Sequence, residues 1–154
     1  MSNISISTKE GRKSYFSFSK VHYYFSLLKP RVMYLAIFTS IVGMIIAPGQ
    51  LSIFNSFLVI LAISIGSGAA GALNMWYEIN TDKLMDRTKD RVLPLGLISV
   101  RGALIFGILL SITSIILLYF ASNLFAAGLL GFTIFYYVFI YTVWLKKSTP
   151  QNIV

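Results

Sequence analysis

The sequence predicts an all-α, polytopic membrane protein with four transmembrane helices. Of its 154 residues, 56% are hydrophobic and only 12% are charged, with a mean hydropathy of +0.77. A soluble domain normally carries about 25% charged residues. Two long blocks, residues 32–77 and 102–145, contain no charged residue. Each block is long enough for two membrane passes, because one pass takes about 20 residues.

Residues 1–28 are predicted to form a basic, Ser-rich, cytoplasmic leader ahead of a membrane domain over residues 29–154. No apolar run precedes Val32, which argues against a cleaved secretory signal. Organelle transit peptides are also basic and Ser-rich. The mitochondrial inner membrane therefore stays an alternative to the bacterial inner (plasma) membrane. Lys29-Pro30-Arg31 is typical of a helix start, since proline is tolerated in a first turn.

The two apolar blocks each divide at a turn signal, the first at Pro48-Gly49-Gln50 and the second at Ser122-Asn123. The expected helices are residues 32–47, 53–77, 102–121 and 124–145, with a loop over residues 78–101. All thirteen Lys and Arg lie in residues 1–31, this loop and the tail. The positive-inside rule places these segments, and so both termini, in the cytoplasm. Basic charge that flanks membrane segments indicates topology, and no nucleic-acid partner is expected.

The second expected helix contains a run of small residues, Gly66-Ser67-Gly68-Ala69-Ala70-Gly71. This run matches G-x-G-x-x-G, but a dinucleotide site would need a preceding β-strand. Inside an apolar helix, small residues at these spacings instead favour close helix packing in lipid. The run is therefore interpreted as a packing face.

Cysteine and histidine add little chemistry. The sequence has no cysteine, which excludes disulfides, thiolate metal sites and cysteine nucleophiles in it. Its single histidine, His22, could ligate a haem iron. The favoured interpretation is an interfacial residue beside Tyr23 and Tyr24.

Acidic residues are concentrated in one repeat that follows the second expected helix. They stand four residues apart, at Glu78, Asp82, Asp86 and Asp90, with Asn74 four residues before the first. On a helix this spacing places neighbours on one face, where like charges repel. A cation is therefore expected at this face. Asn74 and Glu78 begin within or at the edge of the apolar segment, where polar and ionisable groups are functional candidates.

The two ends of the repeat receive different interpretations. Asp86 and Asp90 are expected to pair locally with Lys83, Arg87 and Arg91. The proximal residues, Asn74, Glu78 and Asp82, are expected to hold a metal ion. Mg²⁺ commonly binds one or two carboxylates together with substrate phosphates, and arginine suits bidentate phosphate contacts. Carboxylates followed by arginines at a lipid–water boundary fit a magnesium–diphosphate headgroup on a lipid tail.

These residues resemble the first Asp-rich motif of the UbiA-type membrane prenyltransferases, in which acids follow an Asn at the fourth and eighth positions. Similarity to the haem-prenylating branch of that family extends over Asn74-Met75-Trp76-Tyr77-Glu78, Asp82, Met85, Arg87-Thr88, Arg91, Lys29-Pro30-Arg31-Val32 and residues 141–146. Met75 favours this branch over the quinone-type relatives, which usually have Asp there. The resemblance covers the chain from about residue 25 to its end.

The resemblance implies Mg²⁺-dependent transfer of a farnesyl group from farnesyl diphosphate to a vinyl group of haem b within the lipid bilayer. Asn74, Glu78 and Asp82 would be catalytic and metal-ligating. The residues implied for diphosphate binding are Lys29, Arg31, Lys83, Arg87 and Arg91. The chain departs from the family pattern at Glu78 and Asn80, where Asp is usual, and at Val92, where Pro is usual.

Members of the family are much longer and carry a second Asp-rich motif. The chain is therefore expected to be half of a UbiA-type helical bundle, completed by a second polypeptide or copy. One alternative is an inactive or split N-terminal fragment of the enzyme. Another UbiA-type prenyltransferase or a small four-helix transporter is disfavoured. Transporters place an essential acid at mid-membrane, whereas the acids here fall at the interface.

Overall fold

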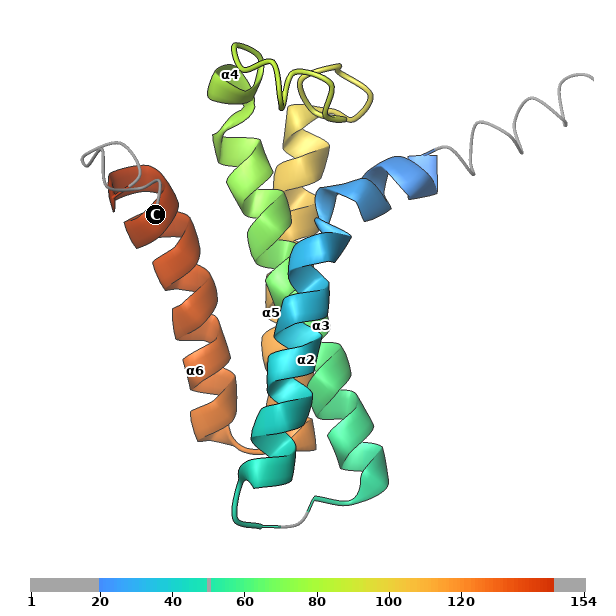
Figure 1. The fold of residues 1–154 in the computed structure, drawn as a ribbon, viewed down its shortest axis with the longest axis vertical. Coiled ribbons are helices and arrows are strands. Elements are labelled where there is room, and N and C mark those ends of the chain that lie inside the picture. The colour runs from blue at the N-terminus through green and yellow to red at the C-terminus, as the bar shows by residue number, and fades with distance from the viewer. Residues whose placement is uncertain (1–19, 50, 146–154) are drawn as a thin grey trace, which may run out of the picture.

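The computed structural model describes residues 20–49 and 51–145, which form helices and turns and no strand (Figure 1). The main elements are α2 (Pro30–Ile46), α3 (Ile53–Tyr77), α4 (Ile79–Asp82), α5 (Val100–Ala121), α6 (Leu124–Phe135) and the π-helix η1 (Tyr136–Leu145). This confirms the all-α fold class. Most of the expected leader and the tail after residue 145 lie outside the described residues, so the division at residue 28 stays a prediction.

Three spans are long and apolar enough to cross a membrane, namely Ile53–Tyr77, Val100–Ala121 and Leu124–Trp144. A fourth is present if the helix Lys20–Leu27 and α2 are counted as one span, with a bend of 55° between them. At the bend, Lys29 adopts the left-handed conformation with φ 51° and ψ 68°. This conformation is uncommon for any residue other than glycine, and the helical region is disfavoured for a residue that precedes proline. The sequence therefore interrupts the helix at this point.

Polar side chains start three of the helices. Ser52 accepts a hydrogen bond from Asn55 N at 3.2 Å, and Ser99 accepts one from Gly102 N at 3.1 Å. Asn123 accepts one from Ala126 N at 2.8 Å. Each bond satisfies a backbone N–H that has no partner within the helix. Because of the Ser99 cap, α5 begins two residues before the expected segment.

Helix α3 is the centre of the bundle. It packs most extensively on α5, next on α2, and also contacts α6, η1 and α4. Figure 1 shows α3 beside both α2 and α5, and the helix formed by α6 and η1 lies to the left of these three. Between α3 and the α6–η1 helix lies the cluster Ala70, Leu73, Ile134 and Val138. Every other described element of the bundle is therefore positioned by α3.

The small-residue run of α3 lies at this crowded centre, and Gly66, Gly68 and Gly71 are buried. A Cβ added at Gly68 would lie 3.1 Å from the Leu28 side chain, and one at Gly71 would lie 3.3 Å from the Leu28 carbonyl oxygen. The absence of side chains allows the bend before α2 to approach the α3 backbone. The interpretation of this run as a packing face is confirmed.

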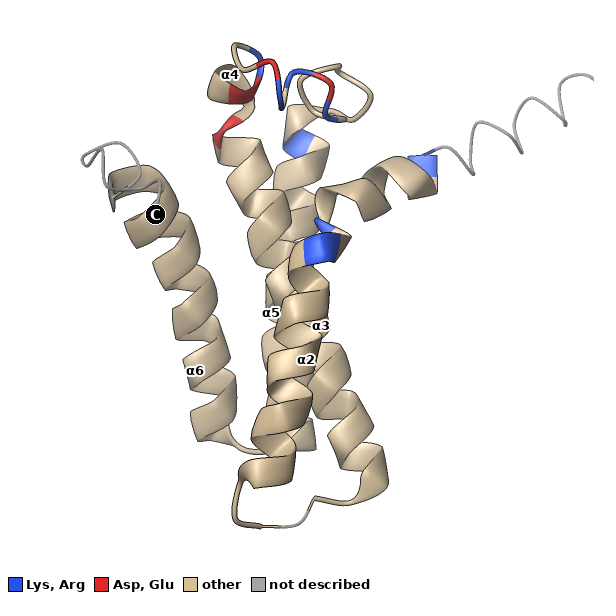
Figure 2. Ribbon diagram, viewed as in Figure 1, with Lys and Arg blue, Asp and Glu red and all other residues tan. Residues whose placement is uncertain are grey.

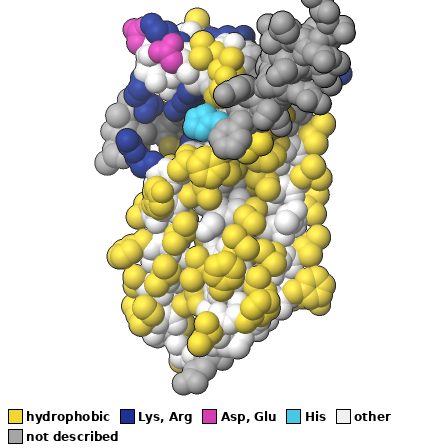
Figure 3. Space-filling model, turned by 90° about the vertical axis from the view of Figure 1, so that its right-hand side faces the viewer, with side chains coloured by type: hydrophobic (Ala, Val, Ile, Leu, Met, Phe, Trp, Pro, Cys, Tyr) yellow, Lys and Arg dark blue, Asp and Glu magenta, His cyan; other side chains and the backbone are white. Residues whose placement is uncertain are grey.

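Charge and apolar surface are separated along the bundle. Figure 2 shows that the Lys, Arg, Asp and Glu residues of the described chain gather toward the end that carries α4. The rest of the face in Figure 3 is covered by hydrophobic side chains, as expected for contact with lipid. His22 is exposed at the boundary between these regions. Trp76 and Trp144 lie near the ends of α3 and η1 on the charged side.

Packing of α5 on α3 depends on Gly107, where an added Cβ would meet Leu73 Cδ2 at 2.7 Å and Cγ at 2.8 Å. We expect Gly107→Leu to lower the free energy of unfolding by about 1–3 kcal/mol, because overpacking forces side chains and backbone apart. Thermal unfolding in detergent measures this. Gly128 has no atom within 4 Å of an added Cβ, so Gly128→Leu is the matched control and should change the midpoint little. Equal effects of the two changes would contradict the packing assignment.

Candidate functional site

Asn74, Glu78 and Asp82 lie on successive turns at the charged end of α3. Glu78 N donates to Asn74 O at 3.0 Å, and Asp82 N donates to Glu78 O at 2.7 Å. The helical repeat therefore continues from α3 through Glu78 into α4. All three residues are buried, with exposed fractions of 3%, 9% and 3%. The structure thus brings the three residues predicted as metal ligands to one place.

The side chain of Asn74 joins three separate elements. Its Oδ1 accepts a hydrogen bond from Lys29 Nζ at 2.5 Å, at the bend before α2. Its Nδ2 donates to Thr142 Oγ1 in η1 at 3.1 Å. Thr142 in turn donates to the Tyr137 carbonyl oxygen at 2.8 Å. Lys29, predicted as a phosphate-binding residue, is therefore brought directly to the acidic turns.

Asp82 is bound by the loop that follows it. Its Oδ2 lies 2.8 Å from an Arg91 guanidinium nitrogen, and the Asp82 side chain is only 4% exposed. The buried hydroxyl of Thr88 donates to the Asp82 carbonyl oxygen at 3.0 Å. These contacts turn the chain back after α4. Arg91, nine residues from Asp82 in sequence, is thereby brought to the site.

In the distal half of the acidic repeat, the ion pairing differs from the pairing expected from the sequence. Because α4 ends at Asp82 and turns follow, the four-residue spacing no longer places side chains on one face. Asp86 pairs with Lys89 at 2.7 Å, and their side chains are 98% and 52% exposed. The expected partners were Lys83, Arg87 and Arg91, so the pairing of Asp86 was predicted wrongly. Asp90 is exposed.

The remaining residues predicted to bind diphosphate are on the surface. Lys83 and Arg87 are exposed in the segment after α4, and Arg31 is exposed in the first turn of α2. They are not drawn into the buried cluster that holds Lys29 and Arg91. Their position suits contact with a ligand at the membrane surface.

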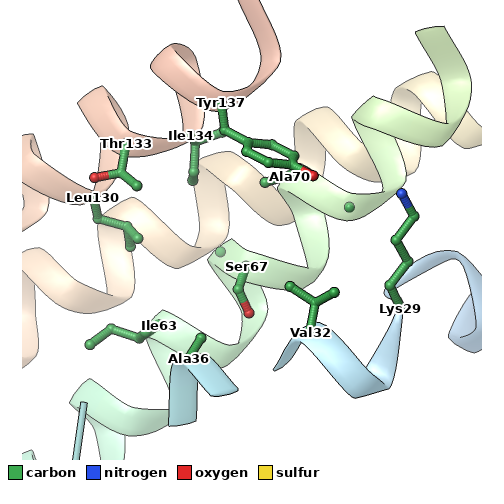
Figure 4. Close-up of a pocket in the computed structure, with 12 residues that line it drawn as sticks. Lys29, Val32, Ala36, Ile63, Ser67, Ala70, Leu130, Thr133, Ile134 and Tyr137 are labelled. Atoms are coloured by element: carbon green, nitrogen blue, oxygen red, sulfur yellow. The ribbon is translucent and has the colours of Figure 1, made fainter. Parts of the chain in front are cut away.

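An apolar cavity of about 220 Å³ lies between α2, α3, α6 and η1. Its walls include Val32, Ile63, Ser67 and Ile134, and its lining also includes Lys29 and Tyr137. In Figure 4, Lys29 approaches from the α2 side and Tyr137 from η1, across α3. The residue that contacts Asn74 is therefore also part of this cavity. The arrangement suits a ligand with an anionic head and an apolar tail.

Two site residues were missed by the sequence analysis. Thr142 lies in residues 141–146, which carry part of the family resemblance but were given no role, and Tyr137 lies in a segment interpreted only as a membrane helix. Thr142 is 1% exposed, and a buried hydroxyl needs a hydrogen-bond partner. A polar residue in a membrane helix was the available signal. The sequence could not show that its partner is Asn74, which is 68 residues away.

The donor set at the acidic turns fits Mg²⁺. It consists of oxygen ligands, two carboxylates and one amide, which is the chemistry that this ion prefers when substrate phosphates supply the other ligands. Oδ1 of Asn74 already accepts from a cationic group, the Lys29 ammonium. Within the described ranges, no three His, Cys, Asp or Glu side chains come together in a group that could hold a metal ion. If Glu78 and Asp82 held the ion, a phosphate-bearing ligand would have to supply the remaining coordination.

The fold and the site define a polytopic helical membrane protein with carboxylates and an amide beside an apolar cavity. The chain belongs to the UbiA prenyltransferase family, which matches residues 36–154.

Three similar curated proteins are each named protoheme IX farnesyltransferase. The one from Sinorhizobium fredii is 57% identical over 131 residues, 85% of this chain and 41% of the relative. The one from Bartonella henselae is 50% identical over 149 residues, 97% of this chain and 48% of the relative. The one from Rhizobium meliloti is 56% identical over 131 residues, which are 85% of this chain and 42% of the relative. The chain therefore spans less than half the length of these relatives, in their N-terminal part. No solved structure matches it.

Removing the Arg91 side chain should leave the buried Asp82 carboxylate without its guanidinium partner. We expect Arg91→Met to lower the free energy of unfolding by about 1–3 kcal/mol, the cost of a buried polar group that loses its partner. Thermal unfolding without added ligand is the measurement. Lys89→Met is the matched control, because the Lys89–Asp86 pair is exposed and such pairs contribute less than about 1 kcal/mol. Adding Asp82→Asn to Arg91→Met should recover part of the loss; no recovery would count against the pair.

Proposed function

We propose that the chain serves a prenyltransferase that moves a farnesyl group from farnesyl diphosphate to a vinyl group of haem b, giving haem O. The observation that carries the proposal is the placement of buried Asn74, Glu78 and Asp82 next to Lys29, which also lines the apolar cavity. The names of these relatives support the choice of haem as acceptor and of farnesyl as the transferred group.

The polar half of the site would bind the diphosphate headgroup. Asn74, Glu78 and Asp82 would hold Mg²⁺, which when bound would neutralise charge on the leaving diphosphate. Lys29 carries its ammonium group into the same place and would attract phosphate oxygens. Arg91 holds Asp82 in position through its 2.8 Å contact and has further N–H groups for phosphate. Preorganised cations of this kind stabilise charge that develops as the allylic C–O bond breaks.

Residues at the surface would act at the rim of the site. Lys83, Arg87 and Arg31 are exposed at the charged end of the bundle, where the anionic groups of both substrates would arrive from the membrane surface. Diphosphate oxygens and the propionates of haem b are both suited to contacts with arginine.

The apolar half of the site would bind the isoprenoid. The cavity between α2, α3 and η1 is lined mainly by aliphatic side chains such as Val32, Ile63 and Ile134. Such walls exclude water, which would otherwise capture the allylic cation. The cavity would therefore hold the tail while the acidic turns hold the head.

Localisation follows from the separation of charge. Charged residues of the described chain gather at one end of the bundle (Figure 2). By the positive-inside rule this end would face the cytoplasm. We propose a multi-pass protein of the bacterial inner membrane with the acidic turns on the cytoplasmic side; the mitochondrial inner membrane is the alternative.

A second candidate is an inactive or split N-terminal fragment of the same enzyme. It is favoured by the acidic turns, because no three His, Cys, Asp or Glu side chains of the described residues come together in a group that could hold a metal ion. In this case a second polypeptide or copy would complete the metal site.

The activity is tested with membranes that carry the chain, supplied with haem b, farnesyl diphosphate and Mg²⁺ and analysed for haem O by mass spectrometry. We expect Glu78→Gln and Asp82→Asn each to lower the rate by about 100-fold or more, as for loss of one preorganised charge-stabilising group. Removal of Mg²⁺ with a chelator should abolish product. Asp86→Asn is the matched control, since Asp86 is exposed on the same segment, and it should retain the rate.

A chimera tested in parallel distinguishes an active enzyme from an inactive fragment. In the chimera, this chain is joined at its C-terminus to the part of the Bartonella henselae relative that it does not match. Product from the chimera but not from the chain alone would support the fragment. Haem O formation that is insensitive to both Glu78→Gln and Asp82→Asn would reject the site assignment.

The cavity assignment is tested by Ser67→Leu, which adds bulk to the cavity wall. We expect KM for farnesyl diphosphate to rise about tenfold, roughly the effect of losing one or two methylene-sized contacts. The shorter geranyl diphosphate should be affected less, because it needs less of the cavity. The assay is haem product formation by the active form of the chain. Thr113→Leu, at an exposed position of α5, is the control; an equal effect of Ser67→Leu on both donors would argue against the cavity as the tail site.

A further inference from the structure

Thr142 is a buried polar residue of η1 that the proposed reaction has not so far used. It is 1% exposed, and its hydroxyl makes contacts on two sides. On one side the hydroxyl lies 2.8 Å from the Tyr137 carbonyl oxygen of its own helix. On the other side it lies 3.1 Å from Asn74 Nδ2. It is therefore the link between η1 and the acidic turns of α3.

The geometry determines which way the Thr142 proton points. A threonine hydroxyl has one hydrogen to donate, whereas a carbonyl oxygen can only accept. The proton must therefore go to the Tyr137 carbonyl, and the Thr142 oxygen is left as an acceptor toward α3. The bond spans five residues, which matches the wider turn of a π-helix, and π-helical segments occur frequently at functional sites.

An acceptor at Thr142 contributes to the orientation of the Asn74 amide. The NH₂ group of Asn74 must face Thr142, so its carbonyl oxygen faces the opposite way, where Lys29 Nζ lies at 2.5 Å. The reversed amide would place NH₂ against the Lys29 ammonium and oxygen against the Thr142 oxygen, so that both contacts would be repulsive. The Thr142 oxygen and the Lys29 ammonium therefore favour the same orientation of Asn74, and the Thr142 hydroxyl holds the NH₂ end of that amide.

We propose that Thr142 is a positioning residue that holds the Asn74 oxygen toward the metal–diphosphate site. The proposal rests on the proposed function, because it takes the Asn74 oxygen as a ligand for Mg²⁺. Thr142 itself touches neither metal nor substrate and acts only through Asn74. Partners of this kind orient metal ligands, and their loss typically costs about 10–100-fold in metal affinity.

The first experiment measures binding rather than turnover. The purified chain in detergent is titrated with Mg²⁺ at a constant concentration of inorganic diphosphate, and binding is followed by the rise in the thermal unfolding midpoint. Thr142→Val keeps the shape but removes the hydroxyl, and we expect it to need about tenfold more Mg²⁺ for half-maximal stabilisation. Thr142→Ser retains the hydroxyl and should return the requirement to within about twofold of the original chain.

Thr39→Val is the matched control. The Thr39 hydroxyl is exposed on α2 and donates to carbonyl oxygens of its own helix, Leu35 O at 3.0 Å and Ala36 O at 3.1 Å. This change should leave the Mg²⁺ requirement as it was. A Mg²⁺ requirement for Thr142→Val equal to that of the original chain would overturn the proposal. A requirement for Thr142→Ser as high as that for Thr142→Val would also overturn it, since the effect would then be one of packing.

A second measurement separates this inference from the proposed function. The side-chain NH₂ resonances of Asn74 are observed in ¹⁵N-asparagine-labelled protein and assigned by their loss in Asn74→Asp. Without any ligand they should shift in Thr142→Val and return in Thr142→Ser. If the original chain binds no Mg²⁺–diphosphate, the proposed function fails, and these resonances alone decide whether Thr142 orients Asn74. Resonances that do not change in Thr142→Val would reject that orientation.

Discussion

The structure of the site depends on one buried amide. Asn74 is 3% exposed at the charged end of an otherwise apolar helix, where an unsatisfied polar group would cost several kcal/mol. Its two ends are satisfied by Lys29 and by Thr142, which belong to two separate elements. Hydrogen bonding of Asn74 therefore requires that the bend before α2 and the helix η1 both reach α3. The same requirement brings Lys29, which lines the apolar cavity, next to Glu78 and Asp82.

Helix α3 combines packing and chemistry along its length. Its small residues allow α5 and the bend before α2 to approach closely; Gly66 lies near Ser114 of α5, and Gly71 lies near the Leu28 backbone. Small side chains also leave the space beside α3 from which the cavity is formed, with Gly66 and Gly71 in its lining. A helix that carried large side chains here would fill the cavity and separate its neighbours. The polar end can therefore lie directly above a space suited to an apolar tail.

The departures from the family pattern have different structural settings. Asn80 is exposed in α4, whereas Glu78 and Asp82 on either side of it are buried. The missing carboxylate is thus on the solvent side of the turn. Val92 is half-buried and packs against a cluster that contains Leu93 and Ile98, so an apolar side chain at this position supports the loop. Glu78, where Asp is usual, retains a carboxylate on the buried side.

The sequence by itself determined the class of fold, because long uncharged segments cannot be stable in water and must cross a membrane as helices. Local spacing also determined that Asn74, Glu78 and Asp82 share a face, since four-residue spacing depends only on helical geometry. Tertiary structure alone decided what binds them. The turn at Thr88 replaced the expected continuation of the acidic repeat and brought Arg91 to Asp82, and packing across α3 brought Lys29 and η1 to Asn74. Such contacts join residues far apart in the chain, so no local pattern encodes them, and they arise only when buried polar groups must find partners.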